Sequence, residues 1–286
     1  MWKEIAQHIG KITEKEFFVN HRRSVGGGCI NQGYALSGDS DTYFVKVNSA
    51  SQIAMFEAEA LGLQQMLATA TIRAPKPICW GTAAGSAYLV LEWLELGSGD
   101  MKSWQEMGRK LAAMHSHTSS KGFGWQQNNT IGSTPQINTW TADWAEFYAQ
   151  HRLGYQFQLA KRRGGQFPQQ ETLLEVIPLM FADYQPQPSL VHGDLWGGNA
   201  ACTVTGEPVI FDPAMYFGDH EVDIAMTELF GGFPPAFYQG YNEFPLDPGY
   251  EKRKTLYNLY HILNHFNLFG GGYESQANRM ISQILA

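Results

Sequence analysis

Short apolar runs separated by turn residues fill the first 95 residues of the chain, a pattern typical of β-strands. One segment, 51–68, differs because its apolar residues recur every three or four positions, which predicts an amphipathic helix. The expected order is three strands, this helix and two further strands. The predicted strands cover residues 17–25, 29–36, 42–48, 77–83 and 86–94.

Helical spacing of apolar residues dominates the rest of the chain, after a linker expected at 95–100. We therefore predict an α+β protein with a sheet-rich N-terminal lobe, 1–95, and a larger, mostly helical C-terminal lobe, 96–286. The predicted helices cover 101–118, 139–157 and 251–269, and short strands are expected at 189–194, 202–205 and 208–212.

The composition excludes several classes of protein. Hydrophobic residues make up 44% of the 286 positions and charged residues 16%, so the chain is expected to fold rather than remain disordered. A net charge of −7 argues against nucleic acid or an anionic membrane as partner, and the basic clusters at 22–23, 161–163 and 252–254 are interpreted as solvated faces. Neither a signal-peptide core nor a membrane-spanning run is present in the sequence, so a cytoplasmic location is expected.

Three cysteines, Cys29, Cys79 and Cys202, form no CxxC pair, so neither a zinc site nor a disulfide framework is expected. Cys29 follows directly after a run of three glycines whose backbone potential could lower the pKa of the thiol. We therefore treat Cys29 as a candidate redox residue; the alternative is a small apolar packing residue.

Polar residues gather in the sequence LVHGDLWGGNA, which suits neither a regular helix nor a regular strand. Asp194 and Asn199 are separated there by two glycines, so the backbone can turn sharply enough for both side chains to reach one pocket. Asp212 follows 18 residues after Asp194 at the end of a short strand, and Pro213 is expected to hold it extended. A hairpin between them would bring together two carboxylates and a carboxamide, oxygen ligands suited to Mg²⁺. The alternative is that both aspartates are turn residues.

Lys46 lies in the strand YFVKVN on the same face as Phe44, and could simply extend to solvent. Upstream, Gly27 and Gly28 would allow backbone N–H groups to approach phosphates, although GGGCINQG is not a GxGxxG motif. The order of features is more informative than any one of them. A glycine-rich hairpin, a strand lysine, a helix glutamate, HxDxxxxN and a strand-end aspartate are together the parts required for phosphoryl transfer from ATP.

These motifs make the sequence resemble the fructosamine kinase (ketosamine 3-kinase) family of the protein-kinase-like superfamily. The blocks HGDLWGGN and FDPA carry the resemblance, and GGGCINQGY, MFEAEALGL, AYLVLEWL, LFGGF and YHILNHFNLFGGGY extend it over nearly the whole chain. It implies a bilobal protein-kinase-like fold, with one main helix beside a small antiparallel sheet in the N-terminal lobe. It also implies transfer of the γ-phosphate of ATP to the 3-hydroxyl of a ketosamine, the Amadori product of a sugar and an amine. The resulting 3-phosphate releases the amine, so the implied role is deglycation and protein repair.

The resemblance also implies roles for the polar residues of the C-terminal lobe. Asp194 would be the catalytic base that receives the acceptor's hydroxyl proton, and Asn199 and Asp212 would bind Mg²⁺. Asp223 resembles the aspartate that braces the catalytic loop, the alternative being a helix N-cap. Only ten residues separate Asp212 from Asp223, which leaves no room for a long activation loop and predicts no control by phosphorylation there.

ATP would bind between the lobes. Lys46 would contact the α- and β-phosphates and pair with a helix carboxylate, for which Glu57 and Glu59 compete because residues two apart on a helix cannot share a face. We favour Glu59. Glu92 and Leu94 would offer main-chain groups to adenine.

The acceptor site is less clearly marked. Trp196 could stack on the sugar and His265 could contact it from the opposite side, although either residue could instead belong to the core. In protein kinases an arginine precedes the catalytic aspartate and a phenylalanine follows the metal aspartate. Here Gly193 and Pro213 take those places, which favours a small-molecule-like acceptor.

Two other functions stay open. A kinase for aminoglycosides, choline or another small alcohol would share the catalytic parts, whereas a nucleotide-binding pseudokinase is disfavoured because all of these parts are intact. The expected partners are ATP, Mg²⁺ and a free or protein-bound ketosamine, without nucleic acid or membrane. A monomer is expected, and a dimer stays open.

Overall fold

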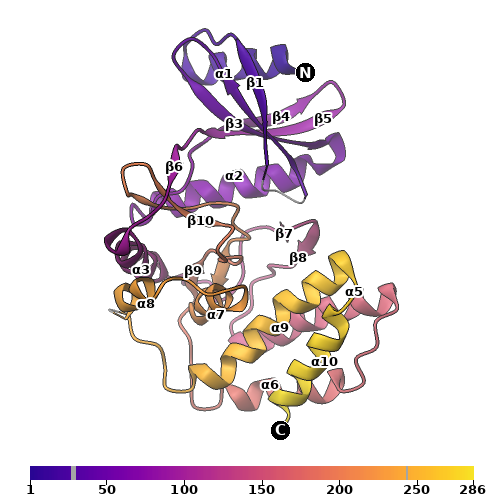
Figure 1. The fold of residues 1–286 in the computed structure, drawn as a ribbon. Coiled ribbons are helices and arrows are strands. Elements are labelled where there is room, and N and C mark those ends of the chain that lie inside the picture. The colour runs from indigo at the N-terminus through magenta and orange to yellow at the C-terminus, as the bar shows by residue number, and fades with distance from the viewer. Residues whose placement is uncertain (27–29, 243) are drawn as a thin grey trace.

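The computed structural model describes residues 1–26, 30–242 and 244–286 and has two lobes, one above the other in Figure 1. The N-terminal lobe is built on a five-stranded antiparallel sheet with the strand order β1-β2-β3-β5-β4. After a first helix, the predicted order of three strands, a helix and two strands is confirmed. The strands are β1 (His21–Val25), β2 (Gln32–Ser37), β3 (Thr42–Ser49), β4 (Pro77–Ala83) and β5 (Ser86–Glu92).

Two helices cover the two faces of this sheet. Side chains alternate along a strand, so Val90 of β5 packs with Ile5 of α1 (Trp2–Thr13), whereas Leu89 packs with Phe56 of α2. Helix α2 (Ile53–Ala68), preceded by a single 3-10 turn, lies between the sheet and the C-terminal lobe (Figure 1). Helix α1 was not predicted because its buried stripe contains only three residues.

The C-terminal lobe is mostly helical, as expected, but its helices differ from the prediction. The segment 139–157 is not one helix from its start: α4 begins after Asp143, whose carboxylate accepts a hydrogen bond from the Glu146 N–H at 2.7 Å. The helix then runs through a π-helical turn, Tyr148–Gly154, into α5. No helix among the described residues is long and apolar enough to cross a membrane. The helices are α3 (Met101–His115), α4 (Trp144–Phe147), α5 (Tyr155–Arg163), α6 (Gln170–Met180), α7 (Glu221–Leu229), α8 (Pro235–Tyr241), α9 (Tyr250–Phe269) and α10 (Tyr273–Ile284).

Short strands connect these helices and shape the loops near the lobe junction. The expected linker contains β6, which pairs with β10, and an unpredicted hairpin consists of β7 and β8. Strands β10 and β11 pair antiparallel, with Ala200 opposite Ile210. This hairpin brings Asn199 close to Asp212, as predicted from the turn between the two strands. The strands are β6 (Leu96–Gly97), β7 (Asn129–Ile131), β8 (Thr134–Gln136), β9 (Ser189–Val191), β10 (Ala200–Thr203), β11 (Pro208–Ile210) and β12 (Tyr216–Gly218).

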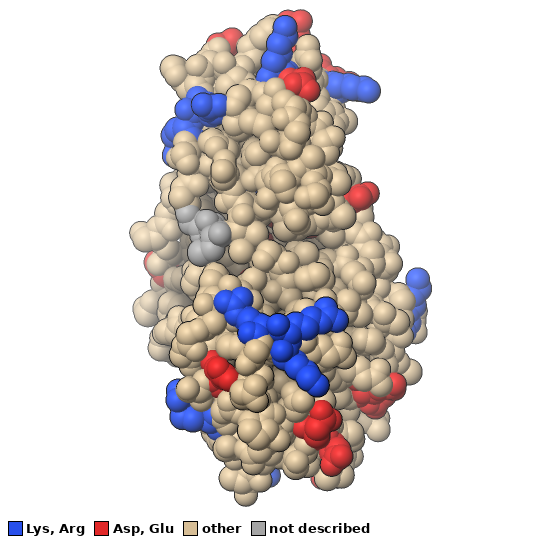
Figure 2. Space-filling view, turned by 90° about the vertical axis from the view of Figure 1, so that its right-hand side faces the viewer, with Lys and Arg blue, Asp and Glu red and all other residues tan. Residues whose placement is uncertain are grey.

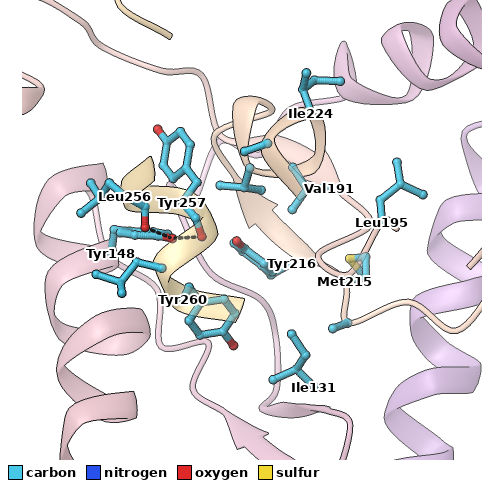
Figure 3. Packing of buried hydrophobic residues seen from close by; sticks show 14 of the residues in the cluster. Ile131, Tyr148, Val191, Leu195, Met215, Tyr216, Ile224, Leu256, Tyr257 and Tyr260 are labelled. Atoms are coloured by element: carbon cyan, nitrogen blue, oxygen red, sulfur yellow. Dashed lines mark hydrogen bonds between the residues drawn. The ribbon is translucent and has the colours of Figure 1, made fainter. Parts of the chain in front are cut away.

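A core rich in tyrosine fixes α9 against the strands of the C-terminal lobe. Tyr148, fully buried, donates to the backbone carbonyl of Tyr257 at 3.1 Å, as Figure 3 shows. Beside it, the buried guanidinium of Arg152 lies 4.0 Å from the centre of the Tyr216 ring and donates to the side-chain oxygen of Asn138 at 2.8 Å. These buried hydrogen bonds hold their elements in one arrangement, although Arg152 Nε has no partner among the described residues.

One of the basic clusters is not a solvated face. Arg253, within the cluster 252–254, is buried, and its Nε and Nη2 donate to the two carboxylate oxygens of Glu221, both at 2.8 Å. The prediction was wrong there because Glu221 is itself fully buried and requires a paired cation. The clusters at 22–23 and 161–163 are exposed as expected, and Figure 2 shows basic side chains gathered on the C-terminal lobe below the grey atoms.

Candidate active site

A tight loop after β9 brings Asp194 and Asn199 together. Gly193 adopts a left-handed backbone with φ of 82°, and a Cβ at this position would lie 2.2 Å from the carbonyl oxygen of Ala214, so only glycine is compatible with it. The side-chain amide of Asn199 donates to the backbone carbonyl of Asp194 at 2.9 Å and to its Oδ2 at 3.2 Å. The asparagine therefore holds the aspartate while its own Oδ1 is available to a cation.

Asp223 braces this loop from below. Its carboxylate accepts hydrogen bonds from the backbone N–H groups of His192 at 2.7 Å and Gly193 at 2.9 Å, and it contacts His115 Nε2 at 3.0 Å. Burial alone would raise the pKa of Asp223, but His115 and these donors outweigh it and lower the pKa. Helix α7 begins at Glu221, so Asp223 is not its N-cap, which was the alternative interpretation.

A buried ion cluster joins the lobes. Lys46 is 5% exposed, and its Nζ lies 2.6 Å from Glu59 Oε1 and also contacts Asp212 Oδ1. The ion pair forms with Glu59 and not with Glu57, which is exposed. Burial alone would lower the pKa of Lys46, but the two carboxylates raise it, so the lysine stays charged.

The backbone of Asp212 departs from expectation. It is left-handed, with φ of 57°, and not held extended by Pro213. Strand β11 ends at Ile210, the Phe211 N–H donates to the Asn199 carbonyl at 3.0 Å and the Ala214 N–H donates to the His192 carbonyl at 2.9 Å, so the turn at Asp212 lies between two contacts with the loop that carries Asp194. Aspartate is among the few residues that tolerate this conformation, which here directs the carboxylate towards Lys46.

Asp194 has the electrostatics of a base that works near neutral pH. Burial, followed by repulsion from Asp212, raises its pKa to about 7, while the hydrogen bond from Asn199 opposes the rise. Asp223 is fully buried, which alone would raise its pKa, but His115 and the backbone donors lower it. Two neighbouring carboxyl groups whose pKa values shift in opposite directions are typical of an active site. In such a site one group can exchange a proton while the other stays ionised.

A cleft of about 710 Å³ between the lobes contains most of the predicted site residues, and Asp223 lies behind the catalytic loop. The side chain of Glu92 contacts Arg73 and accepts from the Lys76 N–H, and the Glu92 N–H donates to the Lys76 carbonyl at 2.8 Å. The predicted Gly27, Gly28 and Cys29 lie outside the described residues. The cleft is lined by Lys46, Glu59, Glu92, Leu94, Asp194, Trp196, Asn199, Asp212 and His265, among others.

Aromatic side chains form one wall of the cleft. Trp196 meets Phe230 edge to face at 6.2 Å between ring centres, and Phe230 lies 5.0 Å from His265. Phe269 and Tyr273 lie 5.7 and 5.1 Å from His265. Phe230, Phe269 and Tyr273 were not predicted; the only sequence signal was an aromatic residue beside the glycine runs of LFGGF and LFGGGY. We call these five residues the aromatic wall.

The tautomer of His265 is set by the helix that carries it. Its Nδ1 donates to the backbone carbonyl of His261 at 2.8 Å, which leaves Nε2 as an acceptor. Burial lowers the pKa of His265, so the ring is neutral near pH 7. A neutral acceptor beside exposed aromatic faces is suited to a polar ligand with apolar surfaces.

The polar residues fit Mg²⁺ and do not fit a metal held by protein alone. No group of three or more histidine, cysteine, aspartate or glutamate residues with metal-binding geometry occurs in the described part of the chain. The Asp212 side chain is 43% exposed beside Lys46, and Asn199 Oδ1 is available. One carboxylate and one carboxamide are the partial set that Mg²⁺ uses when phosphate oxygens and waters complete its shell.

Comparison with known proteins agrees with this geometry. The sequence model of the fructosamine kinase family matches residues 1–286. A probable ketoamine kinase of Synechocystis is 60% identical over 99% of this chain and 97% of its own length. The chloroplastic protein-ribulosamine 3-kinase of Arabidopsis thaliana is 47% identical over 96% of this chain and 85% of its own.

Solved structures share the fold. A Haemophilus somnus structure that carries the fructosamine-3-kinase name has a TM-score of 0.94 and 32% identity over 100% of this chain and 98% of its own. The aminoglycoside phosphotransferase APH(4)-Ia has a TM-score of 0.66 at 14% identity, with 98% of each chain covered, a likeness of the protein-kinase-like fold alone.

Asp223→Asn tests the brace. The backbone N–H groups of His192 and Gly193 donate to different oxygens of Asp223, so the amide nitrogen would leave one of these buried donors unsatisfied. An unsatisfied buried donor costs about 1–3 kcal/mol, so we expect the free energy of unfolding to fall by about 2 kcal/mol. Urea unfolding measures the loss, with exposed Asp183→Asn as the matched control. A loss below about 1 kcal/mol would show that the loop does not depend on this carboxylate.

Proposed function

The chain belongs to the fructosamine kinase family, and we propose that it transfers the γ-phosphate of ATP to the 3-hydroxyl of a ketosamine. The observation that carries the proposal is the convergence, in one cleft, of the ion cluster around Lys46, the pair Asp194 and Asn199, and the aromatic wall. Its relatives are named ketoamine kinase and ribulosamine 3-kinase. The product, a ketosamine 3-phosphate, would release its amine, which makes the reaction a deglycation.

For ATP binding we assign Lys46 to the α- and β-phosphates, with Glu59 orienting its ammonium group. The buried ion pair supports this, because it presents a permanently charged lysine to the cleft. Main-chain groups of Glu92 and Leu94 would contact adenine, and the engagement of the Glu92 side chain by Arg73 is compatible with a contact that uses no side chain. Asn199 and Asp212 would hold Mg²⁺, which neutralises charge on the transferring phosphates.

For catalysis we assign Asp194 as the group that positions the acceptor hydroxyl and receives its proton. Phosphoryl transfer passes through a loose transition state, so alignment of the hydroxyl matters more than strong basicity. A carboxyl group with a pKa of about 7 is well matched to this task. Asn199 holds its Oδ2, and Asp223 fixes the backbone just before it.

For the acceptor we assign the aromatic wall, with Trp196 and His265 at its centre. A ketosamine carries a cationic amine beside a sugar, and aromatic faces attract both cations and the C–H faces of sugars. Trp196 is 39% exposed and Phe269 is 52% exposed, so apolar surface faces the cleft when it holds no ligand. His265 Nε2 would accept a hydrogen bond from the amine or a sugar hydroxyl.

The absence of control by activation-loop phosphorylation stays a prediction, and the segment between Asp212 and Asp223 supports it. Residues 214–222 are buried. The only hydroxyl group in this segment belongs to Tyr216, which lies against Arg152 and is 2% exposed. A kinase acting on this segment would find no accessible acceptor.

The reaction is tested by supplying Mg²⁺ and ATP with fructosyl-lysine, ribulosyl-lysine, choline or an aminoglycoside. We expect transfer to a ketosamine, and a decrease in kcat of at least about a hundredfold in Asp194→Asn, because the amide cannot accept the proton. ³¹P NMR of the product identifies the phosphorylated position. Transfer only to choline or the aminoglycoside would exclude the ketosamine assignment, and full activity of Asp194→Asn would exclude the mechanism.

The pH profile tests the assignment of the base. Below its pKa Asp194 carries a proton and cannot accept another, so kcat/KM for the ketosamine should fall tenfold per pH unit on the acid side. The pKa of about 7 is that of Asp194 in the protein without metal. Bound Mg²⁺ would stabilise the carboxylate and so shift the acid side of the kcat/KM profile to lower pH. A profile that is flat between pH 5 and 8, with ATP saturating throughout, would contradict this assignment.

Trp196→Leu tests the acceptor site. Loss of the aromatic face should lower kcat/KM for the ketosamine about tenfold, in line with the roughly 1–2 kcal/mol of a desolvated cation–π contact. The KM for ATP should stay unchanged and serves as the internal control, and Trp196→Phe should retain most of the activity. Equal losses for ATP and the ketosamine would indicate damage to the catalytic loop rather than to acceptor binding.

A further inference from the structure

The Nδ1 atom of His261 is buried and has no hydrogen-bond partner in the described part of the chain. The residue lies on α9 and is 4% exposed. Most buried polar atoms in folded proteins are paired, because an unpaired one loses its hydration without replacement. We therefore expect His261 Nδ1 to gain a hydrogen-bond partner when the protein binds its ligands.

The nearest carboxylate is that of Asp194. His261 Nδ1 lies 3.9 Å from Asp194 Oδ1, about 1 Å beyond hydrogen-bond length. The other oxygen, Oδ2, already accepts from Asn199. Asn199 Nδ2 and His261 Nδ1 thus lie beside different oxygens of the Asp194 carboxylate. Hydrogen bonds to catalytic groups are often long in free enzymes and shorten when the substrate binds.

We propose that His261 is a positioning residue that donates a hydrogen bond from Nδ1 to Asp194 Oδ1 when the acceptor fills the cleft. His261 acts through Asp194 because Asp194 lines the cleft and His261 does not. With Asn199 on one oxygen and His261 on the other, the carboxylate is held in a single plane facing the acceptor hydroxyl. The inference rests on the proposed function of Asp194.

The charge state of the histidine agrees with this role. Burial lowers the pKa of His261 to about 3, so the ring is neutral near pH 7 and donates as N–H rather than as a cation. A neutral donor supports the carboxylate without forming an ion pair that would withdraw it from the reaction. The carboxylate in turn selects the tautomer with the proton on Nδ1.

The surroundings of His261 hold its ring in place. It packs edge to face on Tyr260, whose hydroxyl donates to Gln136 Oε1 at 2.7 Å. Gln136 Nε2 donates to the backbone carbonyl of Ala214 at 2.9 Å, in the loop that follows Asp212. A chain of contacts thus connects α9 through β8 to the metal-binding side of the site, so the ring cannot easily turn away.

A matched pair of substitutions separates hydrogen bonding from packing. His261→Asn places an amide close to the position of Nδ1, whereas His261→Leu has a similar shape without a donor. We expect His261→Leu to lower kcat for fructosyl-lysine about thirtyfold, with the KM values for ATP and fructosyl-lysine within about twofold, because a misplaced base costs up to about a hundredfold in rate. His261→Asn should retain kcat within about threefold.

Equal kcat values for the two variants, whether both normal or both reduced, would overturn the proposal. Thermal unfolding of both variants, expected to match within a few degrees, shows whether a common loss reflects folding. A wild-type protein that phosphorylates choline or an aminoglycoside and no ketosamine refutes the proposed substrate only, and the same pair is then compared on that acceptor.

A second measurement needs no turnover. ¹⁵N NMR of the imidazole, with ADP, Mg²⁺ and fructosyl-lysine present, should show a proton on Nδ1 whose shift changes in Asp194→Asn. A ring protonated only on Nε2, or one that does not respond to Asp194→Asn, would exclude the hydrogen bond even if the protein proves to have no kinase activity.

Discussion

Burial of the Lys46 ammonium is the constraint on which the rest of the site depends. A charge removed from water requires paired carboxylates, and Lys46 receives one from each lobe: Glu59 from α2 and Asp212 from the turn after β11. Asp212 makes this contact from a left-handed backbone. That turn is positioned by the antiparallel pairing of β10 with β11. One buried cation thereby links the sheet of one lobe to the catalytic loop of the other.

The same principle assigns different properties to two neighbouring carboxylates, Asp223, which is fully buried, and Asp194, whose side chain is 23% exposed. Asp223 accepts two backbone hydrogen bonds and contacts His115, and its pKa falls. Asp194 has the single amide of Asn199 and the negative charge of Asp212 nearby, and its pKa rises to about 7. Desolvation raises the pKa of both, yet the pKa of the more buried aspartate falls, so the donors and the neighbouring charges decide the direction of each shift.

The sequence predicts the site where local rules are sufficient. Strand alternation placed Lys46 on the face of Phe44, towards α2, and the spacing of Asp194, Asn199 and Asp212 with a turn between them predicted their convergence. Features that depend on tertiary contacts were missed. Asp212 contacts Lys46 of the other lobe from a left-handed backbone, and buried Arg253 pairs with Glu221, 32 residues away in the chain. Likewise, no local pattern shows that Phe230 and Tyr273 meet beside His265, because their helices are packed together only in the folded lobe.

This division also locates substrate specificity. The ion cluster and the loop that carries Asp194 are built from β3, α2 and the β9–β11 region, to which we assign phosphate binding and transfer. The aminoglycoside phosphotransferase APH(4)-Ia shares this fold at 14% identity. The aromatic wall is built mainly from the ends of α7, α9 and α10, which the phosphate chemistry does not need. Function follows from the site and not from the fold, so the choice of acceptor should depend on this wall. Trp196 is the exception, because it lies in the same loop as Asp194 and also packs on Phe230, so this short segment contacts both parts of the cleft.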